Sequence, residues 1–547
     1  MKNHSSSVFL QIKKRVFIGV GLMFIATVQL CAQSPAKPNV LFIAIDDLKP
    51  ILGCYGNQLI KTPNIDRLAK MGTVFMSNYC QQAVCGPTRA SMLTGRRPDY
   101  TKVWDLKTPM RDVNPDILSL PQYLISQGYT TQGIGKVYDP RNVDEELDVP
   151  SWSVPYYKSA KGYFSQQTGE PVLGQYQSPA TKLQANNLLK EATEKGLKKK
   201  EARLYVEESV KPTTEGVDVP DNAYEDGANV YRSKDILIQL SKSTQPFFFA
   251  VGIHKPHLPF VAPKKYWDLY KRSDMPVAKF QESSKNAVPV AYTDAGEIRK
   301  YSDIAPLISF TDQKNYGLTL PLAKQQELIH GYYAAVSYSD ALVGILLNTL
   351  DSLGLTKNTI IVLWGDHGWH LGDHNLWCKH TNFEQATHAP LIIAAPGIAP
   401  SKTNATTESV DVFPTLCELT GSTIPTSLDG KSLLPLMKSS SATVKDFAVS
   451  QYPRAGSKEE AKKMGFSSSK YMGYSIRTSR FRYTIWMGDN FRSSQPFKSS
   501  LVVGSELYDY QKDPEETINV VNEKSYSAES KEMLQKMVAF FKSQEGK

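Results

Sequence analysis

A cysteine stands at the start of a predicted helix in QQAVCGPTRASMLTGRRPDY, residues 81–100. The thiol of Cys85 could pack in the core, form half of a disulfide, act as a nucleophile or be the precursor of a modified residue. A phosphatase-type thiolate loop needs an arginine six positions after the cysteine, where this chain has Ser91, and a papain-like protease would carry a different sequence. Core packing alone does not explain Pro87 and Arg89 at fixed offsets. A chemical role for Cys85 is therefore favoured.

Polar residues that could bind a metal or an anion follow four predicted strands. The apolar runs at 39–45, 129–135, 246–253 and 359–365 are typical of buried strands in an α/β sheet. Because ligands bind outside the carboxyl ends of such strands, we expect the residues that follow them to share one rim. In chain order these residues are Asp46-Asp47, Lys136, the sequence HKPH from His254 to His257, and Asp366-His367.

Three aspartates in this set supply the oxygen ligands that a hard divalent cation prefers, calcium before magnesium. Zinc would require more histidine or thiolate ligands. Each residue alone also has an ordinary interpretation. The Asp46-Asp47 pair could form a turn, Lys136 could lie on the surface, and His257 could be a structural histidine. Their shared position at strand ends favours a site.

The first 33 residues predict a secretory signal peptide. Basic residues at 13–15 precede an apolar run at 16–30 that is too short for a comfortable membrane span, and Ala32 offers a cleavage position. Cys31 could carry a lipid, but the bulky Leu30 precedes it where a small residue would be expected. We therefore expect an exported protein, periplasmic or secreted, with no transmembrane anchor after cleavage.

The charge balance is mildly basic. The formal net charge of the whole chain is +9, and the four positive charges of the predicted signal leave +5. Such an excess suits an anionic substrate. The basic run at 194–203 has no interleaved aromatic residues, so no nucleic-acid partner is expected. Five cysteines remain after export, an odd number that leaves at least one thiol unpaired.

The motif CGPTR at 85–89, followed by LTGR at 93–96, resembles the signature of the type I sulfatases. In that family a separate maturation enzyme oxidises the motif cysteine to formylglycine, which implies that Cys85 is the precursor of an aldehyde. Further blocks resemble iduronate-2-sulfatase and its bacterial relatives from about residue 39 to residue 486, with 158–220 the poorest match. They are NVLFIAIDDLKPILGCYG, KTPNIDRLAK, GKVY, FFFAVGIHKPHLPF, WGDHGWHLGDHNLWCKHTNFEQATHAPLI, SQYPRAG and YMGYSIRTSRFRYTIW.

A mechanism follows only from this resemblance. It implies one calcium ion, which polarises a sulfate oxygen and fixes the hydrated aldehyde beside it. One hydroxyl of the hydrate would attack sulfur, and the other would then expel sulfate and regenerate the aldehyde. The implied calcium ligands are Asp46, Asp47, Asp366, His367 and the modified Cys85.

The resemblance also implies roles for basic residues. Arg89 would hold the modified residue, at a helix N-terminus that favours negative charge. Lys136 and Lys379 would neutralise sulfate oxygens. His257 would donate a proton to the leaving alkoxide.

One position departs from the iduronate-sulfatase pattern. In the sequence GKVYDPR, Asp139 stands where that pattern has a histidine that contacts the formylglycine hydrate. A carboxylate could accept a proton from the hydrate, but it would also repel sulfate and could bind the cation instead. The catalytic role implied for this position is therefore open.

The substrate sugar is not determined by these motifs. The carboxylate of a uronate 2-sulfate would need a polar or cationic partner from the rim loops, and Arg477 could equally be a surface arginine of a β-hairpin. The candidate substrate-binding residues are His254, Trp369, His374 and Arg477.

The resemblance implies an α/β fold like that of alkaline phosphatase, a large mixed sheet flanked by helices, as a catalytic domain at 36–438. A polar linker at 437–446 precedes a smaller α+β domain with an antiparallel sheet at 446–547. Near the C-terminus, apolar residues at helical spacing predict core packing. They are Leu534, Met537, Phe540 and Phe541.

The expected function is that of an exported, calcium-dependent sulfatase acting on sulfated saccharides, with the 2-O-sulfate of uronates in glycosaminoglycans as the first candidate substrate. A sulfatase for another sulfated polysaccharide is the alternative. A phosphomonoesterase or phosphodiesterase of the same superfamily would use an unmodified Ser or Thr and two zinc ions. A glycan-binding relative that has lost catalysis is a further alternative, which the presence of Cys85, Lys136, His257 and Lys379 disfavours.

Overall fold

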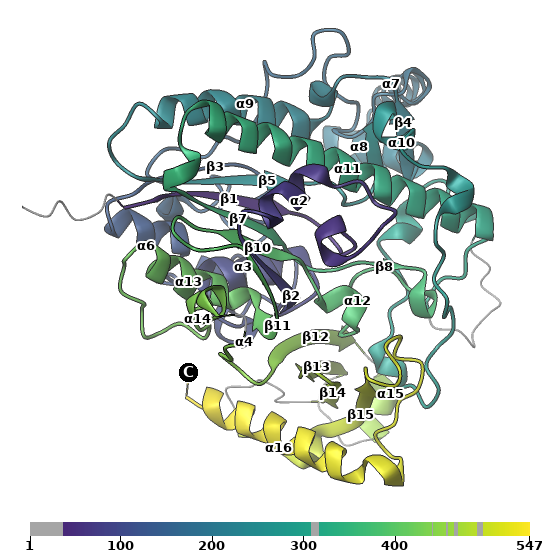
Figure 1. Cartoon of the computed structure of the whole chain (residues 1–547). Helices are drawn as coiled ribbons and strands as arrows, with labels where there is room; N and C mark the ends of the chain where they lie inside the picture. Colours follow the sequence, from purple (N-terminus) through teal and green to yellow (C-terminus); the bar gives the residue numbers. More distant parts are fainter. Residues whose placement is uncertain are drawn as a thin grey trace, which may run out of the picture. The chain divides into compact units, whose positions relative to one another are not determined.

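A seven-stranded mixed sheet organises the larger part of the chain (Figure 1). The computed structural model describes residues 37–307, 317–439, 441–455, 458–463, 469–488 and 496–546, so the predicted signal peptide at 1–33 lies outside the described residues. The strand order is β11-β2-β10-β7-β1-β5-β3, and only β10 runs against its neighbours. The strands are β1 (Asn39–Ile45), β2 (Thr73–Tyr79), β3 (Thr130–Gly135), β5 (Phe247–Ile253), β7 (Thr359–Gly365), β10 (Leu391–Ala394) and β11 (Ser401–Glu408).

Side chains of the central strands alternate between two apolar layers. In β1, Leu41 and Ile43 face one layer while Val40 and Phe42 face the other. Helices cover both faces (Figure 1). On one side lie α2 (Pro63–Ala69), α9 (Glu225–Leu240) and α11 (Leu322–Ser352). On the other lie α3 (Cys85–Thr94), α6 (Leu120–Ser126), α13 (Val412–Leu419) and α14 (Leu434–Lys438).

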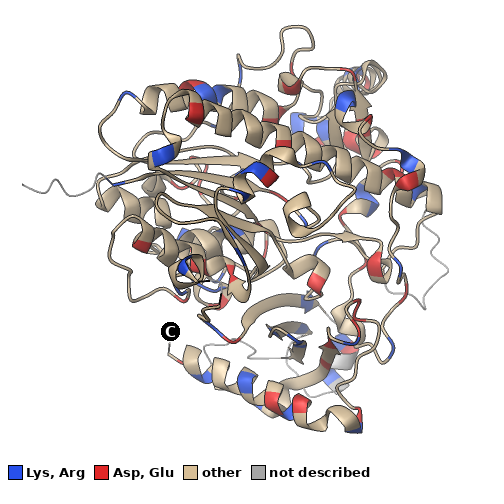
Figure 2. Ribbon diagram, viewed as in Figure 1, with Lys and Arg blue, Asp and Glu red and all other residues tan. Residues whose placement is uncertain are grey.

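The four predicted strands match β1, β3, β5 and β7 to within one residue. None of them contains a charged residue, and the central strands are tan in Figure 2, without blue or red. Charge therefore appears only where each strand ends. Because these four strands are parallel, their carboxyl ends meet at one edge of the sheet.

A second, antiparallel sheet follows near the C-terminus. It contains β12 (Ala448–Ala455), β13 (Lys470–Arg477), β14 (Phe481–Met487) and β15 (Val502–Asp509). Helix α16 (Ser527–Gln544) packs against it through buried Met537, Phe540 and Phe541, with Leu534 half-buried beside them, as the apolar stripe predicts. Gln451 N donates to Gln81 O (2.7 Å), which joins β12 to the segment before α3. The predicted domain boundary at 438–446 stays a prediction.

Shorter elements complete the described ranges. No helix in these ranges has the length and apolar character needed to cross a membrane. The helices are α4 (Pro98–Thr101), α5 (Met110–Val113), α7 (Pro179–Glu194), α8 (Lys199–Ser209), α10 (Lys264–Trp267), α12 (Glu384–Thr387) and α15 (Lys458–Lys463). Two small sheets pair β4 (Thr214–Val217) with β6 (Phe260–Pro263) and β8 (His370–Leu371) with β9 (Trp377–Cys378).

Candidate active site

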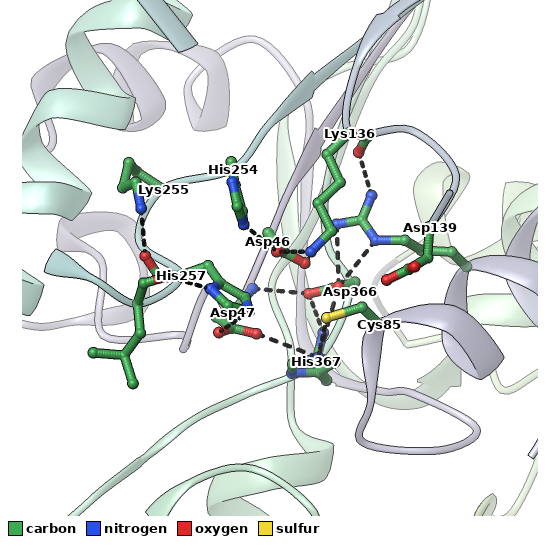
Figure 3. A network of polar contacts seen from close by, with 12 residues as sticks. Asp46, Asp47, Cys85, Lys136, Asp139, His254, Lys255, His257, Asp366 and His367 are labelled. Atoms are coloured by element: carbon green, nitrogen blue, oxygen red, sulfur yellow. Dashed lines mark hydrogen bonds and ion pairs between the residues drawn. The ribbon is translucent and has the colours of Figure 1, made fainter. Parts of the chain in front are cut away.

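The carboxyl ends of four strands and the start of one helix form a buried polar cluster (Figure 3). Asp46 and Asp47 follow β1, and Asp366 and His367 follow β7. Asp47 has a left-handed backbone (φ 57°), which turns the chain sharply after the strand. Its backbone N–H donates to Asp366 Oδ1 (2.9 Å), and the backbone N–H of His367 donates to the same oxygen (3.0 Å). The ends of β1 and β7 are thereby fixed to each other.

Arg89 ties the carboxylates together from α3. Its Nη2 donates to Asp46 Oδ1 (2.9 Å) and its Nε to Asp366 Oδ2 (3.1 Å), while Nη1 donates to the carbonyl oxygens of Lys136 and Val137. The side chain is fully buried. Burial alone would lower its pKa, but the two carboxylates raise it overall. Arg89 is four residues after Cys85, so both lie on the same face of the helix.

Cys85 is the first residue of α3, and its thiol is buried in the cluster. Its Sγ lies 3.6 Å from Nε2 of His367. Burial, followed by Asp46, raises the pKa of the thiol well above its usual value, so the unmodified side chain is a protonated thiol and a poor nucleophile. All five cysteines of the described chain are buried and free.

Burial makes it costly for all three aspartates of the cluster to be ionised at once, even with cations beside them. Lys136 and Arg89 hold the pKa of Asp46 well below its usual value despite burial. Burial raises the pKa of Asp47 even though Lys379 lies beside it. Burial and the Asp46 charge raise the pKa of Asp366 to about 7. A bound cation would favour the ionised forms of Asp47 and Asp366.

The geometry of His367 supports the same conclusion. Its Nδ1 lies 2.9 Å from Gly368 O, an acceptor, so Nδ1 carries the proton and Nε2 presents a lone pair. That lone pair faces Asp47 Oδ1 (3.4 Å) and Asp366 Oδ2 (3.6 Å). Contacts between acceptors are favourable when a cation lies between them. Two groups of possible ligand atoms can be defined, and within each group the atoms lie within 4.8 Å of one another. The first contains Asp46, Asp47, Cys85 and His257, and the second contains Cys85, Asp366 and His367. The donor set fits a hard divalent cation.

Two lysines bring positive charge to this cluster. Lys136 forms an ion pair with Asp46 Oδ2. Lys379 Nζ lies 3.1 Å from both carboxylate oxygens of Asp47 and 3.1 Å from Glu297 Oε1. The ammonium of Lys379 also lies over the Trp369 ring, 4.8 Å from its centre, a cation–π contact that stabilises the charge.

The HKPH segment after β5 positions two histidines. His257 Nδ1 lies 2.6 Å from Leu258 O, and its Nε2 lies 3.1 Å from Glu297 Oε1 and 3.8 Å from Asp47 Oδ2. His254 Nε2 lies 3.7 Å from Asp46 Oδ2. Glu297 was not predicted to be near these residues, because it belongs to an irregular segment with no recognisable pattern.

Lys255 and Asp226 hold this segment in place and were also not identified. Lys255 Nζ donates to the carbonyl oxygens of His257 (2.7 Å) and Pro259 (2.8 Å). Burial lowers its pKa to about 8. Asp226, from α9, accepts the backbone N–H groups of His254 (2.7 Å) and Lys255 (2.8 Å). The only sequence feature that could have indicated a role for Lys255 is its place between the two histidines of HKPH.

The candidate substrate-binding residues lie in different places. His254 lines the cavity described below, whereas Trp369 is fully buried beneath Lys379. The His374 ring stacks on Phe383, with ring centres 4.7 Å apart. Arg477 Nε donates to Glu384 Oε2 (2.8 Å). Neither His374 nor Arg477 lines the cavity, so the structure does not bring them to the cluster.

A cavity of about 1020 Å³ opens from this cluster. Cys85, Lys136, His257 and Lys379 line it together, and several further cations lie along its walls. This arrangement suits an anionic ligand larger than one small ion. The further cations are Arg141, Lys158, Lys211, Lys300 and Arg454.

The fold and this site define a hydrolase with an alkaline-phosphatase-like sheet, and comparisons with known proteins identify its family. Residues 38–422 match the Sulfatase family, and residues 372–543 match the C-terminal region of N-sulphoglucosamine sulphohydrolase. The chain therefore belongs to the sulfatase family, as the CGPTR motif predicted, and is a sulfuric ester hydrolase.

Its relatives include the iduronate 2-sulfatase of Homo sapiens, which is 34% identical over 537 residues, 89% of this chain and 91% of that protein. A phosphonate monoester hydrolase of Agrobacterium radiobacter has a similar structure (TM-score 0.66, 22% identity, 93% of this chain and 96% of that one). So does a protein solved in complex with its substrate D-glucosamine-2-N,6-O-disulfate (TM-score 0.65, 21% identity, 93% and 98%). These two structures confirm the expected fold.

Proposed function

We propose that this sulfatase is an exported, calcium-dependent enzyme that releases sulfate from saccharides, with the 2-O-sulfate of iduronate or another uronate as its first candidate substrate. The observation that carries the proposal is that Asp46, Asp47 and Asp366 surround Cys85, which lines the same cavity as Lys136 and Lys379. The human relative that matches 89% of the chain is named for iduronate 2-sulfate chemistry.

The calcium ion would be held by Asp46, Asp47, Asp366, His367 and residue 85, and when bound it supplies Lewis-acid polarisation of a sulfate oxygen. Oxidation of Cys85 to formylglycine by a maturation enzyme would replace a protonated thiol with a hydrated aldehyde, which can act as a nucleophile. Arg89 fixes Asp46 and Asp366 relative to α3, where residue 85 lies. It thereby sets the position of the nucleophile relative to the carboxylates.

Lys136 and Lys379 are the cations that can meet sulfate oxygens, because both line the cavity beside Cys85. His257 would protonate the leaving oxygen through Nε2, since its Nδ1 is committed to Leu258 O. Burial and then Lys379 lower the pKa of His257 well below its usual value, so the ring is neutral in the free protein. Nε2, which lies 3.1 Å from Glu297 Oε1, must therefore gain a proton before it can act as the acid.

A sulfatase for another sulfated saccharide is the second candidate, and one observation favours it. His374 and Arg477, which the sequence suggested for a uronate carboxylate, are engaged with Phe383 and Glu384 instead. Recognition of the sugar would then fall to His254 and to the cations of the cavity walls.

The test is sulfate release from a panel of sulfated uronate disaccharides and other sulfated glycans. The protein is co-expressed with a maturation enzyme, and mass spectrometry measures formylglycine at position 85. Cys85→Ala should abolish release, whereas Cys80→Ala, which removes a buried thiol outside the motif, should retain it. Release from uronate 2-sulfates supports the first candidate. Release only from other glycans selects the second, and silence across the panel despite confirmed formylglycine overturns the uronate assignment.

Export can be tested separately. Expression of the full chain with its own N-terminus should give an exported protein whose mature end lies near Ala32. A protein retained inside the cell with residues 1–33 intact would contradict the signal peptide.

A further inference from the structure

A buried carboxylate lies in the wall of the cavity, beside the proposed sulfate position. Asp139 follows the turn after β3 that also carries Lys136, and its side chain is fully buried. Asp139, Lys136 and Cys85 all line the cavity, and Figure 3 labels them together. A negative charge at this place opposes the binding of an anion.

Arg141 holds this carboxylate in a two-point contact. Its Nε donates to Asp139 Oδ1 (2.8 Å), its Nη2 donates to Oδ2 (2.7 Å), and its backbone N–H donates to Oδ1 (3.1 Å). Its side chain is 51% exposed and lines the cavity. Burial would raise the pKa of Asp139, but Arg141 and Lys136 lower it overall, so the carboxylate is ionised. The two side chains form a pair with no net charge.

The charge of Asp139 reaches the cations that face the ligand. Its carboxylate contributes to raising the pKa values of Lys136 and Arg89, the residues that hold Asp46. Asp139 is the main cause of the raised pKa of Arg141, and Asp46 makes a smaller contribution. Asp139 and Arg141 therefore act with opposite sign on the same part of the cavity.

We propose that the Asp139–Arg141 pair sets the anion affinity of this sulfatase, with Asp139 weakening the binding of multiply charged anions and Arg141 offsetting that effect. The inference rests on the proposed binding of the sulfate ester at this end of the cavity. A sulfate monoester carries one negative charge, whereas inorganic sulfate carries two. Asp139 alone would disfavour a dianion more strongly than a monoanion, and phosphate monoesters are largely dianionic at neutral pH. Arg141 offsets that bias, so the intact pair keeps a carboxylate in the cavity wall without loss of anion binding.

Three variants separate the two charges. Asp139→Asn removes the negative charge and keeps an oxygen for Arg141, Arg141→Gln removes the positive charge, and the double variant restores the wild-type net charge. The probes are inorganic sulfate and inorganic phosphate, titrated at pH 7.5 into the full-length protein in calcium buffer and measured by calorimetry. Thermal melting checks that each variant is folded, and Asp139→Asn with the double variant keeps the test valid if Arg141→Gln alone is unstable.

The expected pattern follows the sign of the charge. Asp139→Asn should bind both anions more tightly, on the order of tenfold, and Arg141→Gln should bind them more weakly by a similar factor. The double variant should fall within about threefold of wild type, because independent charge effects cancel. The control is Lys264–Asp268, an ion pair whose side chains are 54% and 57% exposed and do not line the cavity. Asp268→Asn should change either affinity by less than about twofold, because solvent screens exposed pairs.

Three results would overturn the proposal. The first is weaker anion binding by Asp139→Asn. The second is a double variant that matches Arg141→Gln, which would show that Arg141 contacts the anion itself. The third is no detectable binding in any of the four forms. These measurements record anion binding and do not require hydrolysis of a substrate. A failure to hydrolyse any sulfated sugar would therefore contradict the proposed function but not the proposed role of the Asp139–Arg141 pair in anion binding.

Discussion

The aspartate cluster at the candidate active site and the junction between the two sheets both bury charged side chains, but they balance charge differently. At the junction, Glu408 accepts from Arg97 Nη1 (2.8 Å) and Lys445 Nζ (2.6 Å), and Glu384 accepts from Arg477 (2.8 Å). Despite burial, these cations lower the pKa of each glutamate to about 2.

In the catalytic cluster the balance is reversed. Burial raises the pKa of Asp366 to about 7 and that of Asp47 well above its usual value, although Arg89 and Lys379 are in contact with them. The cations of the junction thus keep its glutamates ionised, whereas those of the cluster do not offset the burial of Asp47 and Asp366. Perturbed carboxylates beside a cavity are typical of a ligand-binding site, in agreement with the proposed function.

The largest effect should come from neutralising the cluster at Asp47. Asp47→Asn keeps an oxygen for Lys379 and can direct its amide N–H to Nε2 of His367, so the metal-free protein should become more stable by about 1–3 kcal/mol. Sulfate release should nevertheless fall by at least about a thousandfold, because one of the proposed calcium ligands is lost. Urea unfolding in EDTA and initial rates in calcium measure the two effects.

Asp47→Asn is informative because its stability should rise while its sulfate release falls. A loss of stability in EDTA would show that the cluster is balanced without a cation. The matched control is Glu384→Gln at the junction, which should lose stability and keep its sulfate release per folded molecule.

The second effect concerns the junction. Arg477→Met leaves the Glu384 carboxylate buried without its strongest partner, and the free energy of unfolding should fall by about 3–5 kcal/mol. The rate per folded molecule should stay near that of wild type, because Arg477 does not line the cavity. Urea unfolding gives the stability and active-fraction titration gives the rate. A rise in KM for the substrate with unchanged stability would instead assign Arg477 to substrate binding.

Arg477 also shows which parts of the structure could be predicted from the sequence and which could not. Apolar runs predicted four strands, and parallel pairing alone brings the residues after them to one edge of the sheet. Asp46, Lys136, His254 and Asp366 could therefore be placed together without coordinates. The partner of Arg477 is Glu384, 93 positions earlier and on a different element, and no periodicity connects the two.

Irregular segments limited the prediction in the same way. Glu297 contacts Lys379 and His257 from a segment with no repeating pattern, and Arg141 reaches Asp139 across a local turn. Such contacts depend on how loops pack in three dimensions rather than on strand or helix spacing. The departure at Asp139 was visible in the motif, but its pairing with Arg141 was not.

Calcium should have a smaller effect that again distinguishes the two regions. A ligand that binds only the folded state stabilises it by about 2.7 kcal/mol at one hundred times its Kd. We expect such a gain for the wild type on adding calcium to the EDTA-treated protein, a similar gain for Arg477→Met, and little or none for Asp47→Asn. Thermal melting across a calcium titration measures this, and an equal gain in Asp47→Asn would place the cation elsewhere.

The smallest effect is the pH dependence of the junction. The Arg477 guanidinium holds the pKa of Glu384 at about 2 in the folded protein, below the ordinary value of 4.5. Because the folded-state pKa is depressed, the pair contributes its full stability above about pH 4.5, and this contribution is lost as the pH falls towards 2. Between pH 7 and pH 3 the loss should be about 2 kcal/mol.

Comparison with Glu384→Gln isolates this contribution, because the glutamine does not titrate while other acids, including Glu408, titrate equally in both proteins. The difference in unfolding free energy between wild type and variant should therefore shrink from pH 7 to pH 3. A constant difference would show that the pair contributes through packing rather than charge. The difference between the junction and the cluster would then be supported only by the raised pKa values of Asp47 and Asp366.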